Sequence, residues 1–248
     1  MQSFDLGKKV FFLYPPHDFS KNIITGLFRE GFEIYKLNST VSLLKILSAY
    51  PDSILVINTD YPYEDDGFST FTDKILKQEE FKNLMVYTIF NESVSFADKV
   101  RDYIALNRPD EEVYSDLNRI LTEGNAHGKR EYVRYGNFDK YLSTISFTVE
   151  GNDYSEGMHD ISPKALSFSS DKDMEHLVGK SFSDMKLKVG VYEITVHGKV
   201  ELSRMIGGKK IYIAVFDLDE SEKDNIFNFI FTSLEMGMDE IIQKMGGN

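Results

Sequence analysis

The sequence contains no cysteine among its 248 residues. Disulfide bonds, thiolate metal sites and a cysteine nucleophile are therefore excluded, and this fits the reducing environment of the cytoplasm. No apolar run approaches the ~18–20 residues that a membrane-spanning helix needs. The apolar run after the first lysines is too short for the core of a signal peptide. We therefore expect a cytoplasmic protein with no membrane insertion.

Positive charge is scarce, since 28 lysines and arginines face 40 aspartates and glutamates and give a formal net charge of −12. General binding to DNA, RNA or anionic membranes needs a broad positive field, so we expect no nucleic-acid partner. The sequence also lacks a glycine-rich phosphate loop, a nucleophile with a base, and histidines at metal-ligand spacing. We therefore expect no enzymatic activity, no metal and no cofactor.

The first half of the chain alternates short apolar runs with amphipathic stretches. Strands are predicted at 8–15, 32–38, 53–59, 82–90 and 103–106. Helices are predicted at 18–31, 39–51, 67–81, 93–102 and 108–121. Strands that alternate with helices indicate a parallel sheet with helices on both faces, an α/β domain over residues 1–121.

The second half changes to a two-residue period and is predicted to be β. Residues 122–128 contain two glycines and no apolar period, so they are predicted to be a linker. Alternating runs at 141–151, 164–170, 183–206 and 209–218 are separated by 152–157 and by Gly207-Gly208, which indicates an antiparallel β-barrel. A terminal helix is predicted to begin at Ser221 as N-cap. The stripe it is expected to bury comprises Ile226, Phe229, Ile230 and Leu234. The second domain is predicted to cover 129–248.

The segment "RDYIALNRPDEEVYSDLNRIL" resembles the last strand, basic-Pro turn and last helix of response-regulator receiver (CheY-like) domains. Arg108 and Pro109 fall where receivers carry Lys-Pro, and Thr88 falls at their switch position. The residues for phosphotransfer are replaced. Tyr14 and Pro15 stand where receivers carry an acidic pair for magnesium, and Ile57 stands at the phosphoacceptor position. The resemblance therefore implies a degenerate receiver.

One acidic group remains near the end of the third strand. Asp60, with Glu64, Asp65 and Asp66, could bind a metal or accept phosphate in a shifted register. The alternative interpretation is a solvated acidic loop on a pseudo-receiver, and the sequence favours it. A domain that keeps the fold without the acidic pocket is expected to offer a surface for an unidentified protein partner, which is an inference from fold analogy.

Two short motifs stand in order in the second half. Arg130 and Arg134 lie in "REYVR", and Asp160 and Ser162 lie in "DISPKA". The region from Lys129 to Leu234 resembles a PilZ domain, the β-barrel receptor module for cyclic di-GMP. That family carries Arg-x-x-x-Arg ahead of the barrel and an Asp/Asn-x-Ser-x-x-Gly turn. The resemblance implies that these four residues, with Ala165 at the family's glycine position, bind the ligand.

The residue types suit this ligand. An arginine fork matches phosphate oxygens and the O6 and N7 edge of guanine, and its flat face can stack on a purine. Asp160 can accept hydrogen bonds from guanine N–H groups, and Ser162 can donate to a phosphate or cap the turn. Without the second motif, the arginines would instead be surface salt-bridge partners, and Asp160 would begin an Asx-type turn.

Ala165 departs from the family pattern. The family glycine suggests a backbone with positive φ or a close approach to the ligand, and alanine in the left-handed region costs about 1 kcal/mol or more. The sequence therefore predicts weakened binding, which Ala165→Gly would tighten.

The favoured function is a cyclic di-GMP-binding effector or adaptor that passes the signal to a protein partner, and the resemblance suggests bacterial motility or surface behaviour. We expect the ligand to order residues 129–134 and the linker and so to fix the angle between the halves. One alternative is a ligand-free PilZ-like adaptor that acts only through protein contacts. A phosphorylation-dependent regulator that uses Asp60 is the third.

Overall fold

The computed structural model describes residues 7–19, 23–62, 77–91, 100–136 and 143–246, together with Thr72 and Ile75. Its contacts divide the chain into two compact units. The first comprises Met1–Val133 with Glu235–Asn248, and the second comprises Arg134–Leu234. This division differs from the predicted boundaries, because residues 122–133 and the last residues of the chain group with the first unit.

The first unit contains a five-stranded parallel sheet in the order β2-β1-β3-β4-β5. The strands are β1 Val10–Leu13, β2 Ile34–Leu37, β3 Ile54–Asn58, β4 Met85–Phe90 and β5 Asp102–Ala105. Every residue of β1 and β3 is buried, as expected for strands covered on both faces. The order 2-1-3-4-5 is that of CheY-like doubly wound folds, so the predicted receiver-like fold is confirmed.

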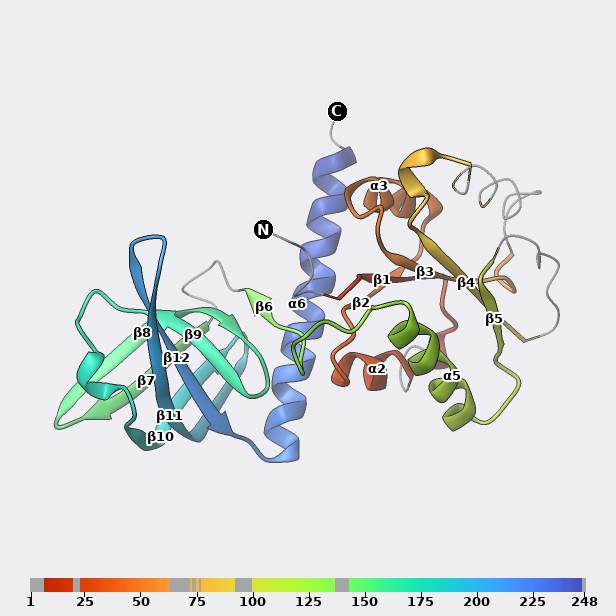
Figure 1. The fold of residues 1–248 in the computed structure, drawn as a ribbon. Coiled ribbons are helices and arrows are strands. Elements are labelled where there is room, and N and C mark those ends of the chain that lie inside the picture. The colour runs from red at the N-terminus through yellow and green to blue at the C-terminus, as the bar shows by residue number, and fades with distance from the viewer. Residues whose placement is uncertain are drawn as a thin grey trace. The chain divides into compact units, whose positions relative to one another are not determined.

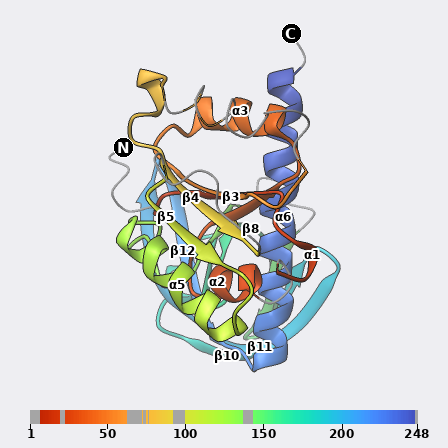
Figure 2. The same cartoon turned by 90° about the vertical axis from the view of Figure 1, so that its right-hand side faces the viewer.

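Helices cover both faces of this sheet. They are α1 His17–Phe19, α2 Thr25–Arg29, α3 Thr40–Ala49, the 3-10 helix η3 Glu79–Phe81, and α5 Asp110–Glu123. Helix α3 lies on one face, and α2 and α5 lie on the other (Figure 2). Ser39 caps α3, because its hydroxyl accepts a hydrogen bond from the Ser42 amide. The helices predicted at 67–81 and 93–102 lie largely outside the described residues.

Residues 122–128, which were predicted to be a linker, pack within the first unit. Ala126 is buried, and the Lys8 amide donates to the Asn125 carbonyl at 3.0 Å. His127 forms a β-bridge with Phe32, and its Nε2 lies 2.8 Å from the Glu30 carbonyl oxygen. These contacts, made by the backbone, by the small side chain of Ala126 and by the ring of His127, give no periodic apolar signal in the sequence, which explains why the segment looks like a linker.

The second unit is a closed antiparallel barrel, as predicted (Figure 1). The strands are β6 Tyr135–Gly136, β7 Ser143–Val149, β8 Asn152–Ile161, β9 Ala165–Ser169, β10 Ser181–Val189, β11 Tyr192–Ile206 and β12 Lys209–Asp217. The order β6-β8-β7-β10-β11-β12-β9 closes through pairing of β8 with β9. A 3-10 helix, η4 Glu175–Leu177, lies between β9 and β10. Alternate residues such as Phe168 and Tyr212 fill the interior.

The residues at 152–157, predicted to separate two strands, instead begin β8. The chain reverses at Glu150 and Gly151, whose φ angles are +52° and +78°. Tyr154 and Met158 face the core, whereas most residues between them are at least partly exposed, so the strand looks polar in sequence. The Gly207-Gly208 hairpin is confirmed, with φ angles of +56° and +80°.

The chain ends in the long helix α6, Glu220–Gly246. Its N-cap is Asp219 and not the predicted Ser221. The Asp219 carboxylate accepts from the Glu222 amide at 2.8 Å, and the Glu222 carboxylate accepts from the Asp219 amide at 3.0 Å, which is a capping box. Ile226 and Ile230 are fully buried. None of the described helices is both long enough and apolar enough to cross a membrane.

Candidate ligand-binding site

The structure brings Arg134 and Asp160, which come from separate sequence motifs, to one place on the barrel. Strand β6 pairs with the end of β8, so that Tyr135 lies opposite Ile161 and Gly136 lies opposite Asp160. Arg134 Nη1 lies 3.5 Å from Asp160 Oδ1, and each side chain is 31% exposed. An arginine fork and a carboxylate therefore meet at a solvent-accessible edge.

Asp160 has unused capacity to accept hydrogen bonds. The pairing of β8 with β9 shifts register between Met158 and Asp160, and Asp160 then lies opposite Ser167. Its Oδ1 atom is buried and accepts no hydrogen bond within the described part of the chain. The contact with Arg134 is therefore an ion pair whose geometry falls short of a hydrogen bond. A ligand N–H group could satisfy this oxygen.

Ser162 and Ala165 form the ends of the tight turn between β8 and β9. The Ser162 amide donates to the Ala165 carbonyl at 2.8 Å, and the Ser162 hydroxyl donates to the same oxygen at 3.0 Å. The Ala165 amide donates to Ser162 Oγ at 3.2 Å. Ser162 is 4% exposed. Of the two roles predicted for its hydroxyl, this geometry corresponds to capping the turn.

The prediction that Ala165 has a strained backbone with positive φ is wrong. The non-glycine residues with positive φ in the described ranges are Tyr14, Asn125 and Glu150, and Ala165 is not among them. Ala165 instead begins β9 and pairs with Val215 of β12. The left-handed conformation that the family glycine suggested is therefore not adopted here.

Ala165→Gly is accordingly expected to leave cyclic di-GMP affinity within about twofold, because there is no backbone strain to relieve. Thermal stability should fall slightly, since glycine in a strand costs about 0.5–1 kcal/mol relative to alanine. Titration and a melting curve of the purified variant measure both quantities. Tenfold tighter binding would show that the side chain at this position obstructs the ligand.

Arg130 is grouped differently from the other predicted site residues. It is exposed, and it lies in the segment that the contacts assign to the first unit. Within the described residues its side chain makes no ion pair and no hydrogen bond. The structure thus groups Arg134, Asp160, Ser162 and Ala165 in one unit and leaves Arg130 outside that group.

The receiver-like unit has hydrophobic and aromatic residues where phosphotransfer would need carboxylates. Ile57 is fully buried at the end of β3. The Asn58 side-chain Nδ2 donates to the Tyr14 carbonyl at 2.9 Å, and the Tyr14 and Tyr61 rings stack with centroids 3.6 Å apart. Within the described residues no group of three histidines or carboxylates could hold a metal ion. Asp60 accepts from the Asn91 side chain at 3.0 Å. Glu64, Asp65 and Asp66 lie outside the described residues.

Acetyl phosphate is therefore expected not to phosphorylate the chain at Asp60. Its carboxylate is engaged by Asn91, and the described residues around it offer no metal site to neutralise a phosphoryl group. Intact mass spectrometry after incubation with acetyl phosphate and magnesium measures this directly. A mass gain of one phosphoryl group that disappears in Asp60→Asn would contradict the pseudo-receiver interpretation.

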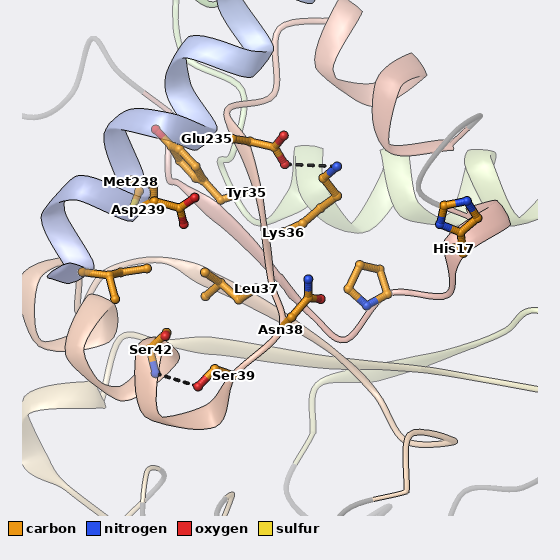
Figure 3. A pocket seen from close by; sticks show the side chains of 12 residues that line it. His17, Tyr35, Lys36, Leu37, Asn38, Ser39, Ser42, Glu235, Met238 and Asp239 are labelled. Atoms are coloured by element: carbon orange, nitrogen blue, oxygen red, sulfur yellow. Dashed lines mark hydrogen bonds and ion pairs between the residues drawn. The ribbon is translucent and has the colours of Figure 1, made fainter.

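A pocket of about 530 Å³ lies in the first unit beside the end of β2 (Figure 3). The charged side chains in its wall are partly paired, because Lys36 Nζ lies 3.1 Å from Glu235. Burial, together with the nearby Glu33, raises the pKa of Tyr35, so its hydroxyl stays protonated. Asp239 adds a further negative charge to the wall. The pocket therefore offers no net positive charge for an anionic ligand, and no predicted site residue lines it.

Comparison with known proteins gives structural likenesses only. No protein-family description and no curated protein matches the sequence. YcgR of Escherichia coli in complex with c-di-GMP is 14% identical, with a TM-score of 0.39, over 48% of this chain and 51% of that chain. The K. pneumonia MrkH–c-di-GMP complex is 15% identical, with a TM-score of 0.39, over 45% and 55%.

A CheY-like receiver domain protein from Methanospirillum hungatei JF-1 is also similar. It is 15% identical, with a TM-score of 0.39, over 47% of this chain and 96% of that chain. The matched part spans about half the length of the YcgR and MrkH chains. The likenesses concern PilZ-containing proteins and receivers, which are the two folds that the sequence resembles.

Proposed function

We propose that this protein is a non-enzymatic cyclic di-GMP-binding effector that passes a second-messenger signal to a protein partner. One observation carries the proposal. Arg134 and Asp160, predicted as ligand residues from two separate motifs, lie 3.5 Å apart beside the turn formed by Ser162 and Ala165. A shared position for residues distant in sequence is what a common ligand would require.

The chemistry of these side chains fits the ligand. Cyclic di-GMP carries two phosphodiester charges and two guanines. Arg134 can donate its fork to a phosphate or to guanine O6 and N7. The unsatisfied Oδ1 of Asp160 is buried beside Arg134, so it can accept from a guanine N–H group once this contact is released. Releasing the Arg134–Asp160 contact costs little, because partly exposed ion pairs contribute about 0–1 kcal/mol.

A competition experiment tests the ligand assignment. Fluorescently labelled cyclic di-GMP should bind the full chain saturably, and unlabelled cyclic di-GMP should displace it while GTP at the same concentration should not. Displacement by both nucleotides would indicate a general anion site. The signalling part of the proposal predicts that a partner captured with the ligand is lost in Arg134→Ala. If the same partner is captured with and without the ligand, and by both wild type and Arg134→Ala, the signalling part is refuted.

A ligand-free adaptor is the second candidate. The observation that favours it is that the predicted groups already interact with one another. Arg134 pairs with Asp160, and the Ser162 hydroxyl is used within its own turn. If the competition experiment detects no saturable binding to a folded chain, this candidate replaces the first.

A further inference from the structure

A hollow of about 440 Å³ lies on the barrel wall of the second unit, and Lys164 of the "DISPKA" motif is part of its lining. Its lining comes from β10, β11, β12 and the turn after β8. The lining includes Lys164, His197, Lys199, Val215, Phe216 and Asp217. The register of β10 against β11 breaks between Phe182 and Met185, next to the lining residue Ser181. Such a bulge bends the strand locally and can open space on a wall that would otherwise be closely packed.

The hollow is continuous with the candidate site through the strand register. Ala165 lies opposite Val215, Val215 lies opposite Lys199, and Lys199 lies opposite Ser181. The Phe216 amide also donates to the carbonyl of Lys164 at 3.1 Å, within the turn that ends at Ala165. The turn at Ala165 therefore forms one end of the hollow.

Two polar side chains in the hollow are uncommitted. His197 lies opposite Asp217 in the β11–β12 pair, and both are exposed while the adjacent residues Val196 and Phe216 are buried. Directly opposed residues place their Cβ atoms about 5 Å apart on the same face. Within the described ranges, neither side chain makes an ion pair or a hydrogen bond. Lys199, in contrast, is paired with Glu201 at 2.9 Å.

This pair matches one edge of guanine. A carboxylate accepts from both the ring N–H and the exocyclic amino group of guanine, and an imidazole N–H donates to O6 on the same edge. Val215, two residues before Asp217 on the same face of β12, is half-buried and provides apolar surface beside these groups for the ring itself. Adenine presents a ring acceptor where guanine presents a ring N–H, so a carboxylate at that place selects guanine.

We propose that the hollow is a base subsite that takes one guanine ring of the dinucleotide, with Asp217 as the specificity-determining acceptor. This inference rests on the proposed function. Asp160 on β8 lies opposite Ser167 on β9, and Ser167 lies opposite Ile213 on β12. Asp217 is therefore two strands away from Asp160 and four residues further along β12. At about 3.3 Å per residue and 4.8 Å per strand, this separation is on the order of 16 Å. The ligand would thus bind opened out, with one guanine at each carboxylate.

The test compares cyclic di-GMP with cyclic di-IMP, whose rings lack the exocyclic amino group. Wild type should prefer the guanine ligand, and Asp217→Asn should reduce this preference at least about threefold, because a lost hydrogen bond from the amino group has this order of effect. The asparagine side chain of this variant cannot accept both N–H groups, since one arm of its amide is itself a donor. Glu193→Gln, at an exposed carboxylate elsewhere on β11, should leave the preference unchanged.

The outcomes separate this inference from the proposed function. If Asp217→Asn weakens both ligands equally, or neither, the subsite is rejected, while the proposed function stands as long as Arg134→Ala strongly weakens binding. If wild type binds neither dinucleotide, the proposed function fails and the subsite fails with it. A guanine preference that falls in Asp217→Asn and persists in Glu193→Gln supports the subsite.

Discussion

Arg134→Ala is expected to weaken cyclic di-GMP binding by roughly a hundredfold. Charge-assisted hydrogen bonds contribute about 1.5–3 kcal/mol, and a tenfold change corresponds to about 1.4 kcal/mol. The variant also leaves Asp160 without its ion-pair partner, so that an uncompensated carboxylate would face an anionic ligand. Isothermal titration of the purified variant measures the loss, with a melting curve to show that the barrel remains folded.

Two controls make this prediction specific. Arg204→Ala removes the same charge from an exposed arginine on β11 that makes no ion pair within the described residues, and it should change affinity less than twofold. Arg134→Lys keeps the charge but loses the planar fork, so it should recover only part of the affinity. Equal losses of affinity in Arg134→Ala and Arg204→Ala would mean that the overall charge of the protein, and not a specific binding site, attracts the ligand.

Gly31→Ala is expected to destabilise the first unit by about 2–3 kcal/mol and to lower its melting temperature by roughly 5–10 °C. The φ angle of Gly31 is +95°, which alanine adopts only with strain. An alanine Cβ there would also lie 2.6 Å from the Glu131 carbonyl oxygen, a distance that real structures do not tolerate. Calorimetric melting of the full chain, compared with wild type, measures this loss of stability.

Gly179→Ala separates backbone strain from steric conflict. Its φ angle of +85° is similar, but an added Cβ would meet no atom within 4 Å. The expected cost is therefore only the strain, about 1 kcal/mol. Equal destabilisation by the two variants would show that the segment at Glu131 can move away at no cost.

The fold could be predicted from sequence because the pattern of apolar residues differs between the two halves of the chain. Buried runs such as Val10–Leu13 and Ile54–Asn58 indicated parallel strands, and alternation around Gly207-Gly208 indicated an antiparallel hairpin. Strand β8 was missed entirely, since most of its residues, such as Asn152 and Asp153, are at least partly exposed and polar and give no apolar alternation. Asp219 was missed as N-cap because Ser221, two residues later, is an equally good cap by residue type.

The candidate site was predictable in its residue types but not in its geometry. The motifs identified Arg134 and Asp160, yet their pairing depends on β6 adding to β8, which only tertiary structure shows. The extended backbone at Ala165 likewise depends on its pairing with Val215. The opposition of His197 and Asp217 depends on register across strands with bulges, and hydrophobic alternation does not reveal a bulge.

Calorimetric titration of cyclic di-GMP into the wild-type chain tests the central claim most directly. The account predicts saturable binding at micromolar concentration or tighter, with GTP giving no comparable heat. It also predicts that the heat disappears in Arg134→Ala. Absence of heat with a wild-type chain shown to be folded would contradict the account and would identify the barrel as an adaptor that does not bind this ligand.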